Sequence, residues 1–367
     1  MNKKFNIQTI LIAPLDWGLG HTTRCIPIIQ VLLQNNFTVI IAASGKQKIL
    51  LQQEFPSLTF IDLRGYNISY AKNKFLLPCK ILMQVPKILL AIRNEKKWLQ
   101  FAIEKYKIDV VISDNRYGLH STKIPCVFIT HQLLVKMPFK WLENLAQKIN
   151  YHFINKFSAC WIPDFEGDKN IAGKLAHPSK MPSTAVSYIG LLSRFSKIEE
   201  VVMQYNYCII LSGPEPQRTI LEDKIFAEIN TLKENILLIR GKPDCNKTFK
   251  TPDNITIKNH LPGNEISKAM HESNFIICRS GYTTVMEFLS LHKKAILIPT
   301  PGQTEQEYLA KKLMQQQWCF SIEQKNFQLQ KILADVKLFP FQQPQLTENN
   351  LQNKIVELLQ NLTIAQD

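Results

Sequence analysis

Short apolar runs alternate with longer amphipathic stretches along most of this chain of 367 residues. The runs that predict buried strands span residues 9–13, 38–43, 59–62, 109–113, 126–130, 159–162 and 187–189, and then 207–212, 236–240, 255–258, 275–278 and 295–298. Helical stretches separate most of these runs, and strands that alternate with helices form parallel sheets wrapped by helices. We expect an α/β fold with two doubly wound, Rossmann-like domains that face each other across a cleft.

Polar sequence with glycine and proline interrupts the alternation between residues 164 and 182, which indicates a break between domains. We place the first domain at residues 1–190 and the second at residues 191–345. Residues 313–336 are predicted to be helical within the second domain. Residues 346–367 contain a last amphipathic helix, predicted at 348–362, which we expect to pack back on the first domain.

The chain has 44 Lys and Arg against 30 Asp and Glu, which gives a formal net charge of +14. This excess favours an anionic partner, which can be a nucleic acid, an anionic membrane surface or a phosphorylated substrate. RNA-recognition motifs are not apparent, so nucleic acid is the least favoured of the three. The eight cysteines form no CxxC pair, and no stretch approaches the ~20 apolar residues of a membrane-spanning helix, so we expect a cytoplasmic location.

The stretch 275–308 reads as strand, tight turn, helix and strand. The helix begins near Gly281, where free backbone N–H groups and the helix dipole favour an anion such as a diphosphate. Ser280, Thr283 and Thr284 add hydroxyl donors, and Glu287 lies two turns into the helix, within reach of a ribose. The alternative is an ordinary strand-to-helix turn with a serine cap and an exposed glutamate.

The sequence of this stretch resembles that of glycosyltransferase family 28, the MurG-like enzymes with the GT-B fold. The resemblance rests on CRSG at 278–281, the threonine pair, Glu287, the PTP at 299–301 and the Gln306-Glu307-Tyr308 sequence; it is clear in the second half of the chain and loose in the first. It implies that the second domain binds a nucleotide sugar, most often a UDP-sugar, as donor substrate, with no tightly bound cofactor. Gln306 and Glu307 would then contact the sugar, and the first domain would hold the acceptor.

The first predicted turn, residues 14–24, contains Gly18 and Gly20, which let the backbone approach a ligand, followed at once by His21. A neutral imidazole at this place can accept a proton from an acceptor hydroxyl near neutral pH. The turn resembles the glycine-rich first loop of the family but lacks the GGTGGH sequence of the MurG enzymes, so the resemblance does not determine the acceptor. His21 as a structural helix cap is the alternative.

The equivalent turn of the second half contains Ser212, Gly213 and Arg218, where the family has its second glycine-rich loop. Arg218 is expected either to pair with a phosphate or to sit in the first turn of a helix without a ligand. Arg194 resembles the linker arginine of the family that reaches the nucleotide, and on sequence alone it would pass as a solvated charge.

Two polar segments, 114–118 and 130–132, follow strands of the first half, so they should border the same cleft and contact the acceptor unless they only cap the loops. Asp164 and Asp168 flank a loop, and no clustered His, Asp and Glu set indicates a metal site. Backbone amides and arginine are enough to stabilise a leaving diphosphate, so we expect no metal.

A basic segment spans residues 72–97, in which apolar triplets separate Lys72, Lys74, Lys80, Lys87, Arg93, Lys96 and Lys97. Basic residues mixed with apolar clusters suit an anionic bilayer surface. The alternative is a core helix with a solvated basic face, and the resemblance favours the membrane.

Together these features predict a glycosyltransferase that moves a sugar from a UDP-sugar to an acceptor hydroxyl, with inversion and without a metal, on a lipid-linked or cell-envelope molecule. His21 is the expected base. A UDP-sugar 2-epimerase or hydrolase of the same fold is one alternative, and a non-catalytic nucleotide-sugar or nucleic-acid binder is another. Glu307 stands where the family has a glutamine against the sugar, so the sugar itself stays open.

Overall fold

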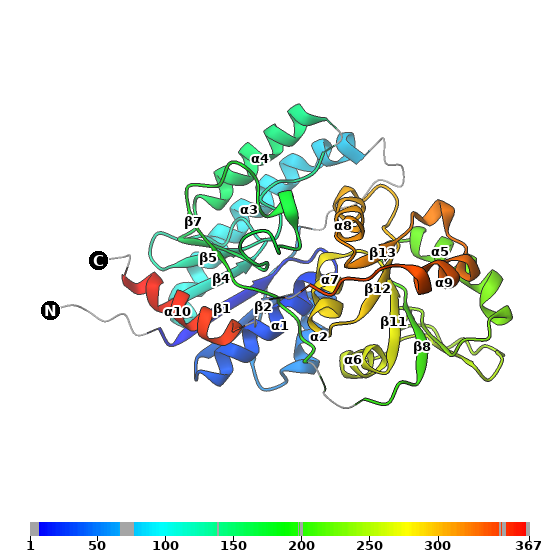
Figure 1. The fold of residues 1–367 in the computed structure, drawn as a ribbon. Helices are drawn as coiled ribbons and strands as arrows, with labels where there is room; N and C mark the ends of the chain where they lie inside the picture. Colours follow the sequence, from blue (N-terminus) through cyan, green and yellow to red (C-terminus); the bar gives the residue numbers. More distant parts are fainter. Residues whose placement is uncertain are drawn as a thin grey trace. The chain divides into compact units, whose positions relative to one another are not determined.

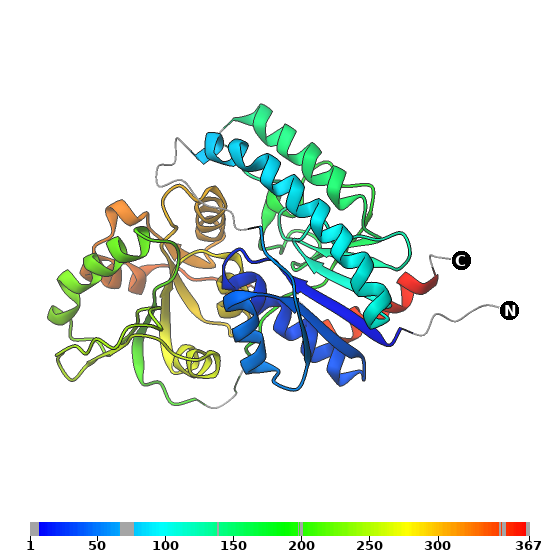
Figure 2. The same ribbon diagram turned by 180° about the vertical axis from the view of Figure 1, so that it is seen from behind.

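The computed structural model describes residues 7–66, 77–137, 139–196, 198, 201–344, 346 and 350–364. Contacts divide the chain into unit 1, Met1–Arg194 with Leu346–Asp367, and unit 2, Phe195–Gln345. Arg194 therefore belongs to unit 1, together with the C-terminal helix. Each unit is built around one parallel sheet (Figures 1 and 2).

Unit 1 contains a seven-stranded parallel sheet of order β3-β2-β1-β4-β5-β6-β7 within the described residues. Its elements are β1 (Thr9–Pro14), α1 (Leu19–Gln34), β2 (Thr38–Ala43), α2 (Gly45–Glu54), β3 (Thr59–Asp62), α3 (Leu77–Tyr106), β4 (Val110–Asp114), β5 (Cys126–Ile129), α4 (Lys140–Ile154), β6 (Ala159–Ile162), the short helix η2 (Gly173–Leu175), β7 (Ala185–Tyr188) and α10 (Leu351–Ile364). Helices α3 and α4 cover one face, and α1, α2 and α10 cover the other (Figures 1 and 2). Strands β1, β4 and β5 are buried on both faces, as their continuous apolar sequence predicts.

Unit 2 contains a six-stranded parallel sheet of order β10-β9-β8-β11-β12-β13. Its elements are β8 (Tyr205–Ile210), α5 (Gln217–Glu228), η3 (Ile229–Thr231), β9 (Ile236–Ile239), β10 (Ile255–Lys258), α6 (Gly263–His271), β11 (Ser273–Cys278), α7 (Tyr282–Ser290), β12 (Lys294–Leu297), α8 (Thr304–Gln315), β13 (Cys319–Ser321), η4 (Gln324–Asn326) and α9 (Leu329–Leu338). Apolar side chains of α5 and α9 pack on one face of the sheet in a single core cluster. Helices α6, α7 and α8 lie on the other side (Figure 1).

The helical prediction for residues 313–336 holds at the two ends of this stretch and is wrong between them. The structure places α8, the edge strand β13 and α9 there, with β13 hydrogen-bonded to β12. Cys319 is fully buried in this strand, and Ser321 Oγ donates to the Leu297 carbonyl oxygen at 3.2 Å. Pairing with β12 therefore overrides the helix-forming sequence on either side.

Candidate active site

His21 lies in the first turn of α1, at the carboxyl edge of the unit 1 sheet. The helix begins after Gly18, whose φ of 78° is a left-handed conformation that glycine adopts without strain. The N-cap residue is a glycine, and the first turn of the helix contains no acidic residue. The positive end of the α1 dipole therefore acts on the space next to His21 without a compensating carboxylate from the helix.

Asp114 ends β4, beside the end of β1, and pairs with His21. Strands β1 and β4 are aligned so that Pro14 and Asp114 are register partners, which brings the carboxylate next to the start of α1. The Asp114 side chain is fully buried, and its Oδ2 lies 3.1 Å from Nδ1 of His21. We had expected Asp114 at this edge from the sequence, but only as a residue near the acceptor.

Arg24, one turn after His21 on α1, completes a buried polar network. Its Nε donates to Asp114 Oδ2 at 2.9 Å, and its NH2 group donates to Asp114 Oδ1. The same NH2 group lies 2.8 Å from Nδ1 of His21, and NH1 lies 2.9 Å from Nδ1 of His131, which follows β5. The polar segment 130–132 thus joins this network through His131.

The charges of this network set the protonation states. Burial alone would raise the pKa of Asp114, but the charges of Arg24 and His21 and their hydrogen bonds outweigh it and lower the pKa to about 2. Burial is also the largest influence on His21, and with the charge of Arg24 it lowers the pKa of His21 below 6.5 against the opposing effect of Asp114. A neutral imidazole beside a carboxylate is the arrangement that a general base requires.

A second buried network fixes the loops beside His21. Glu95 on α3 accepts hydrogen bonds from Arg116 Nε at 2.8 Å, from the Tyr66 hydroxyl at 2.7 Å and from the Gly118 amide at 3.0 Å. Arg116 NH1 in turn donates to the Pro14 carbonyl oxygen at 3.2 Å. The segment 114–118 therefore has a structural role, because it connects the ends of β1 and β4 to α3.

Three adjacent strand ends of unit 2 place polar and glycine residues side by side. Ile210 of β8 is the register partner of Cys278 of β11, and Cys278 is the partner of Leu297 of β12. Gly213, Gly281 and Thr300 each follow their strand by the same three residues. They therefore lie at one level of the carboxyl edge, where a parallel α/β sheet binds its ligands.

Gly281 caps α7 with no side-chain hydrogen bond, and the first turn of the helix contains no acidic residue. Its φ of −69° is open to any residue, and a Cβ added here would meet no atom within 4 Å. Neither the backbone conformation nor the described packing requires glycine at this position. Thr283 and Thr284 are half-buried in the same turn.

Glu287 is 6% exposed on α7, two turns after Gly281. The exposed glutamate of the alternative interpretation is therefore wrong. Burying a carboxylate costs free energy unless polar groups surround it, so Glu287 requires polar partners at this buried position.

Three other predicted ligands of the sugar or diphosphate make contacts inside the protein. The buried Ser280 hydroxyl donates to the Gln306 carbonyl oxygen at 2.8 Å, so it ties two helix starts together and is not a donor to a ligand as we expected. Gln306 Oε1 accepts from the Thr300 amide at 2.9 Å, and Glu307 Oε1 accepts from the Gly302 amide at 2.8 Å. Gln306 and Glu307 therefore brace the loop after β12.

Arg218 is buried in unit 2 and paired with two carboxylates. Its NH2 group lies 2.6 Å from Glu215, and NH1 lies 3.3 Å from Glu222. The structure favours the alternative without a ligand, because a phosphate would have to displace these partners. By contrast, Ser212 and Gly213 are exposed in the preceding loop, and Arg194 is half-buried at the end of unit 1.

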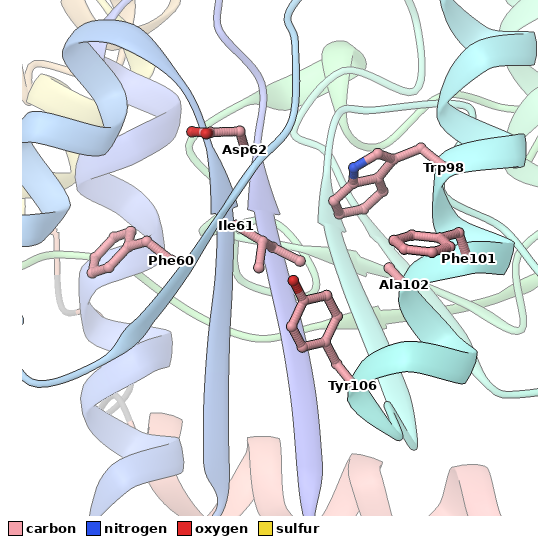
Figure 3. A pocket seen from close by; sticks show the side chains of 7 residues that line it. All are labelled: Phe60, Ile61, Asp62, Trp98, Phe101, Ala102 and Tyr106. Atoms are coloured by element: carbon pink, nitrogen blue, oxygen red, sulfur yellow. The ribbon is translucent and has the colours of Figure 1, made fainter.

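Unit 1 also contains a pocket of about 250 Å³ between β3 and the second half of α3. Trp98, Phe101 and Ala102 project from α3 toward β3, where Asp62 ends the strand (Figure 3). None of the network residues around His21 lines it, and Asp62 Oδ1 accepts from Lys48 Nζ at 2.8 Å. We assign this pocket no role in the candidate site.

Two absences concern the described part of the chain only. No three His, Cys, Asp or Glu side chains gather there in a way that could hold a metal ion. No described helix has the length and apolar character needed to cross a membrane.

Two family models match the chain. The model described as "Glycosyltransferase family 28 C-terminal domain" matches residues 217–362, and the model "Glycosyl transferase family 1" matches residues 9–164. The first half therefore matches a different family from the second. The first match also includes α10, which packs in unit 1.

Relatives and solved structures agree with these models. The chain is 24% identical over 324 residues, 81% of each protein, to an uncharacterized glycosyltransferase of Methanosarcina acetivorans. It is 25% identical over 299 residues, covering 76% of this chain and 75% of the relative, to the UDP-N-acetylglucosamine--N-acetylmuramyl-(pentapeptide) pyrophosphoryl-undecaprenol N-acetylglucosamine transferase of Clostridium botulinum. The structure of MurG from Acinetobacter baumannii superposes with a TM-score of 0.57 and 18% identity, covering 97% of this chain and all of that one.

The fold, the family models and the relatives together define the class: this chain is a glycosyltransferase with the GT-B fold. Within that class, residues 217–362 match the C-terminal domain of glycosyltransferase family 28, and the chain is similar to the MurG-like enzymes.

Proposed function

We propose that this glycosyltransferase moves a sugar from a UDP-sugar to an acceptor hydroxyl, with inversion and without a metal ion. The observation that carries the proposal is the pair of His21 and Asp114, whose Nδ1 and Oδ2 atoms lie 3.1 Å apart at the carboxyl edge of unit 1. A base held by a buried carboxylate is what an incoming hydroxyl needs.

The proposed reaction is a single displacement. The Nδ1–H group of His21 donates a hydrogen bond to Asp114, and Nε2 accepts the proton of the acceptor hydroxyl. The acceptor oxygen attacks the anomeric carbon. The bond from that carbon to the diphosphate oxygen breaks, and the nucleoside diphosphate leaves with the electron pair. Attack opposite the leaving group inverts the anomeric centre. The scheme requires the sugar bound by unit 2 to reach the hydroxyl at His21.

Donor binding is proposed for the carboxyl edge of unit 2. The start of α7, where Gly281 is the N-cap and the first turn contains no acidic residue, faces the diphosphate and stabilises its charge as it leaves. Glu287 accepts hydrogen bonds from the ribose hydroxyls, since it lies on the same helix. Arg194, at the end of unit 1, is proposed as a further cation for the diphosphate.

We further propose a lipid-linked acceptor reached from an anionic membrane surface. The named acceptor of the Clostridium botulinum relative is a pyrophosphoryl-undecaprenol, and unit 1 has an exposed apolar face that suits a bilayer. On α4 the residues Trp141, Leu145 and Ile149 are exposed at a spacing of four, so they form one stripe. Helix α3 runs beside α4 (Figures 1 and 2), and its Leu89 and Leu90 are exposed too.

Basic residues are exposed on the same two helices. They are Lys87, Lys96 and Lys97 on α3 and Lys140 and Lys148 on α4, and their positive charge would attract anionic lipids, although Lys140 also pairs with Glu143 at 3.0 Å. Lys72 and Lys74 of the predicted basic segment lie outside the described residues, and so does the side chain of Lys80. The proposal therefore rests on α4 and on the second part of the segment.

The proposal is tested by UDP release from a panel of UDP-sugars, with and without an undecaprenyl-linked acceptor in detergent. Release that requires the acceptor, with a new glycosidic bond of opposite anomeric configuration in the product, is the expected result. Release without acceptor, accompanied by free sugar or its 2-epimer, would identify the hydrolase or epimerase alternative. Binding without release from any donor would indicate a non-catalytic binder.

A further inference from the structure

Two buried donors of unit 2 have no hydrogen-bond partner among the described residues. They are the Oγ1 atom of Thr300, in a residue that is 1% exposed, and the Nε atom of Arg279, in a residue that is 2% exposed. Buried donors are almost always paired in folded proteins, so an orphaned pair in one place calls for an explanation. Neither residue was among the candidates from the sequence.

The two atoms converge on one point. A Cβ added to Gly213 would lie 3.5 Å from Thr300 Oγ1 and 3.9 Å from Arg279 Nε. Gly213 itself is exposed, and its φ of 100° is one that glycine tolerates. The missing side chain at Gly213 thus leaves a notch, defined here as the volume in front of Gly213, Thr300 Oγ1 and Arg279 Nε.

The notch carries an uncompensated positive charge. Arg279 NH1 donates to the Ile298 carbonyl oxygen at 3.1 Å, and NH2 donates to the Gln217 carbonyl oxygen at 2.8 Å. These neutral acceptors occupy NH1 and NH2, while Nε borders the notch without a partner, and no carboxylate among the described residues pairs with this arginine. Burial lowers the pKa of Arg279 only to about 10, so the guanidinium stays charged at neutral pH.

The other two buried arginines of unit 2 behave differently. Arg218 and Arg240 both pair with Glu222, at 3.3 and 2.5 Å. Each of these two structural arginines therefore has a carboxylate partner within the protein. Arg279 has none among the described residues, and its Nε atom lacks a hydrogen-bond acceptor. A buried cation with a donor turned toward an exposed glycine favours an anion.

We infer that this notch binds a phosphoryl oxygen of the donor diphosphate, with Thr300 Oγ1 and Arg279 Nε as its hydrogen-bond donors. The inference rests on the proposed function and extends it to residues outside the start of α7. Gly213, Gly281 and Thr300 follow the paired residues Ile210, Cys278 and Leu297 by equal steps. A tetrahedral phosphoryl group has enough oxygens to accept from the notch and from the α7 start together.

The test is calorimetric binding of UDP, inorganic pyrophosphate and uridine to the full chain. Thr300→Val removes the hydroxyl and keeps the shape, Thr300→Ser keeps the hydroxyl, and Thr251→Val is the matched control, because its hydroxyl donates to the Ile255 carbonyl oxygen at 2.8 Å. Thr300→Val should weaken UDP and pyrophosphate roughly tenfold or more, the effect of a lost hydrogen bond to a charged group, and leave uridine unchanged. Thr300→Ser and Thr251→Val should bind all three like the parent.

Two further measurements separate this role from a structural one. The melting temperature of Thr300→Val should not fall, because a methyl group replaces an orphaned hydroxyl. Gly213→Ala, which fills the notch with a methyl group in an exposed loop, should show the same selective loss of the phosphate-bearing ligands.

The outcomes distinguish the inference from the proposed function. Equal UDP affinity in the parent, Thr300→Val and Gly213→Ala would overturn the notch and leave the proposed donor intact. Pyrophosphate binding that depends on Thr300, without any binding of UDP, would support the notch and refute the nucleotide donor. A parent chain that binds neither ligand would overturn both.

Discussion

Nδ1 of His21 lies 3.1 Å from Oδ2 of Asp114, although 93 residues separate them in the sequence. Arg24 donates to the same carboxylate and also lies 2.8 Å from the same Nδ1 atom. A proton on Nδ1 can be donated to Asp114 and leaves Nε2 able to act as a base, whereas a hydrogen bond from Arg24 to Nδ1 favours the opposite tautomer. Asp114 and Arg24 together therefore influence which tautomer His21 adopts, and in the proposed mechanism this decides whether Nε2 can accept a proton.

Asp114→Asn should impair both stability and turnover. The amide leaves the charge of Arg24 buried without compensation, which costs about 3–5 kcal/mol of unfolding free energy, and it can donate to Nδ1 and fix the wrong tautomer, which should cost ~10²-fold or more in kcat. Urea unfolding and steady-state kinetics measure the two effects.

Asp164→Asn is the matched control for this change. Asp164 is also fully buried, and its Oδ2 lies 3.1 Å from Nε2 of His177, but it accepts loop amides away from His21. It should lower stability with kcat retained in the folded fraction. An equal loss of kcat in both variants would mean that Asp114 has only a structural role.

The pH dependence of the rate should reflect the lowered pKa of His21. Because burial disfavours the imidazolium, the base stays neutral down to a pH below 6.5, and kcat should rise with pH below 6.5 and level off above it. The same shift acts on stability. The unfolded chain binds a proton that the folded chain resists, so stability is lost as pH falls below 6.5 through the folded pKa. A kcat profile with an acidic midpoint above 6.5 would contradict the account.

Glu287→Ala should weaken UDP binding by about 1.5 to 3 kcal/mol, the range for hydrogen bonds to a charged group, with the fold kept. Calorimetry with UDP and with uridine should show the same loss, because the ribose is common to both. Glu323→Ala is the control, since Glu323 pairs with Lys325 on the surface of the same unit at 2.7 Å. Unchanged UDP affinity in a folded Glu287 variant would remove this residue from the site.

Membrane binding should depend on the α4 stripe. Replacing Trp141 and Leu145 by serine should lower the affinity for vesicles of equal parts phosphatidylglycerol and phosphatidylcholine roughly tenfold or more, as measured by cosedimentation. The reason is that burying each of these side chains in the bilayer contributes about 1.5–3 kcal/mol. Lys80→Glu with Lys87→Glu should reduce binding further, and high salt should do the same. Leu338→Ser, an exposed position in unit 2, should bind like the parent. Equal binding to neutral and anionic vesicles would refute the electrostatic part.

The alternation of apolar runs predicted the strands of both sheets before β13. That alternation reflects burial on both faces, which the sequence shows directly in strands such as β1 and β11. β13 was missed because it has three residues between two helix-forming stretches, and its existence depends on the exposed edge of β12. Local sequence does not encode such a partner.

The sequence predicted those site residues that belong to one contiguous motif. It did not predict the contacts between residues that are distant in the sequence and are brought together by the strand order. His21 and Glu287 each stand in a recognisable turn or helix. The role of Asp114 follows from the placement of β4 beside β1, a neighbour relation that a doubly wound order could have indicated. Thr300 and Arg279 were missed because what distinguishes them is a buried side-chain atom without a hydrogen-bond partner, and only the structure reveals this. The sequence left both roles of Arg218 open, because its pairing with Glu215 and Glu222 becomes visible only in the structure.

The most direct measurement of the central claim compares turnover and donor affinity in His21→Ala. Removing a general base typically costs ~10²- to 10⁴-fold in rate. Binding of the UDP-sugar should barely change, because the proposed ribose and diphosphate contacts lie in unit 2. We predict a kcat lowered by that range with a near-parental UDP-sugar Kd. Full transfer activity in this variant would reduce His21 to a helix cap, and a parallel loss of UDP binding would make it a donor ligand instead of the base.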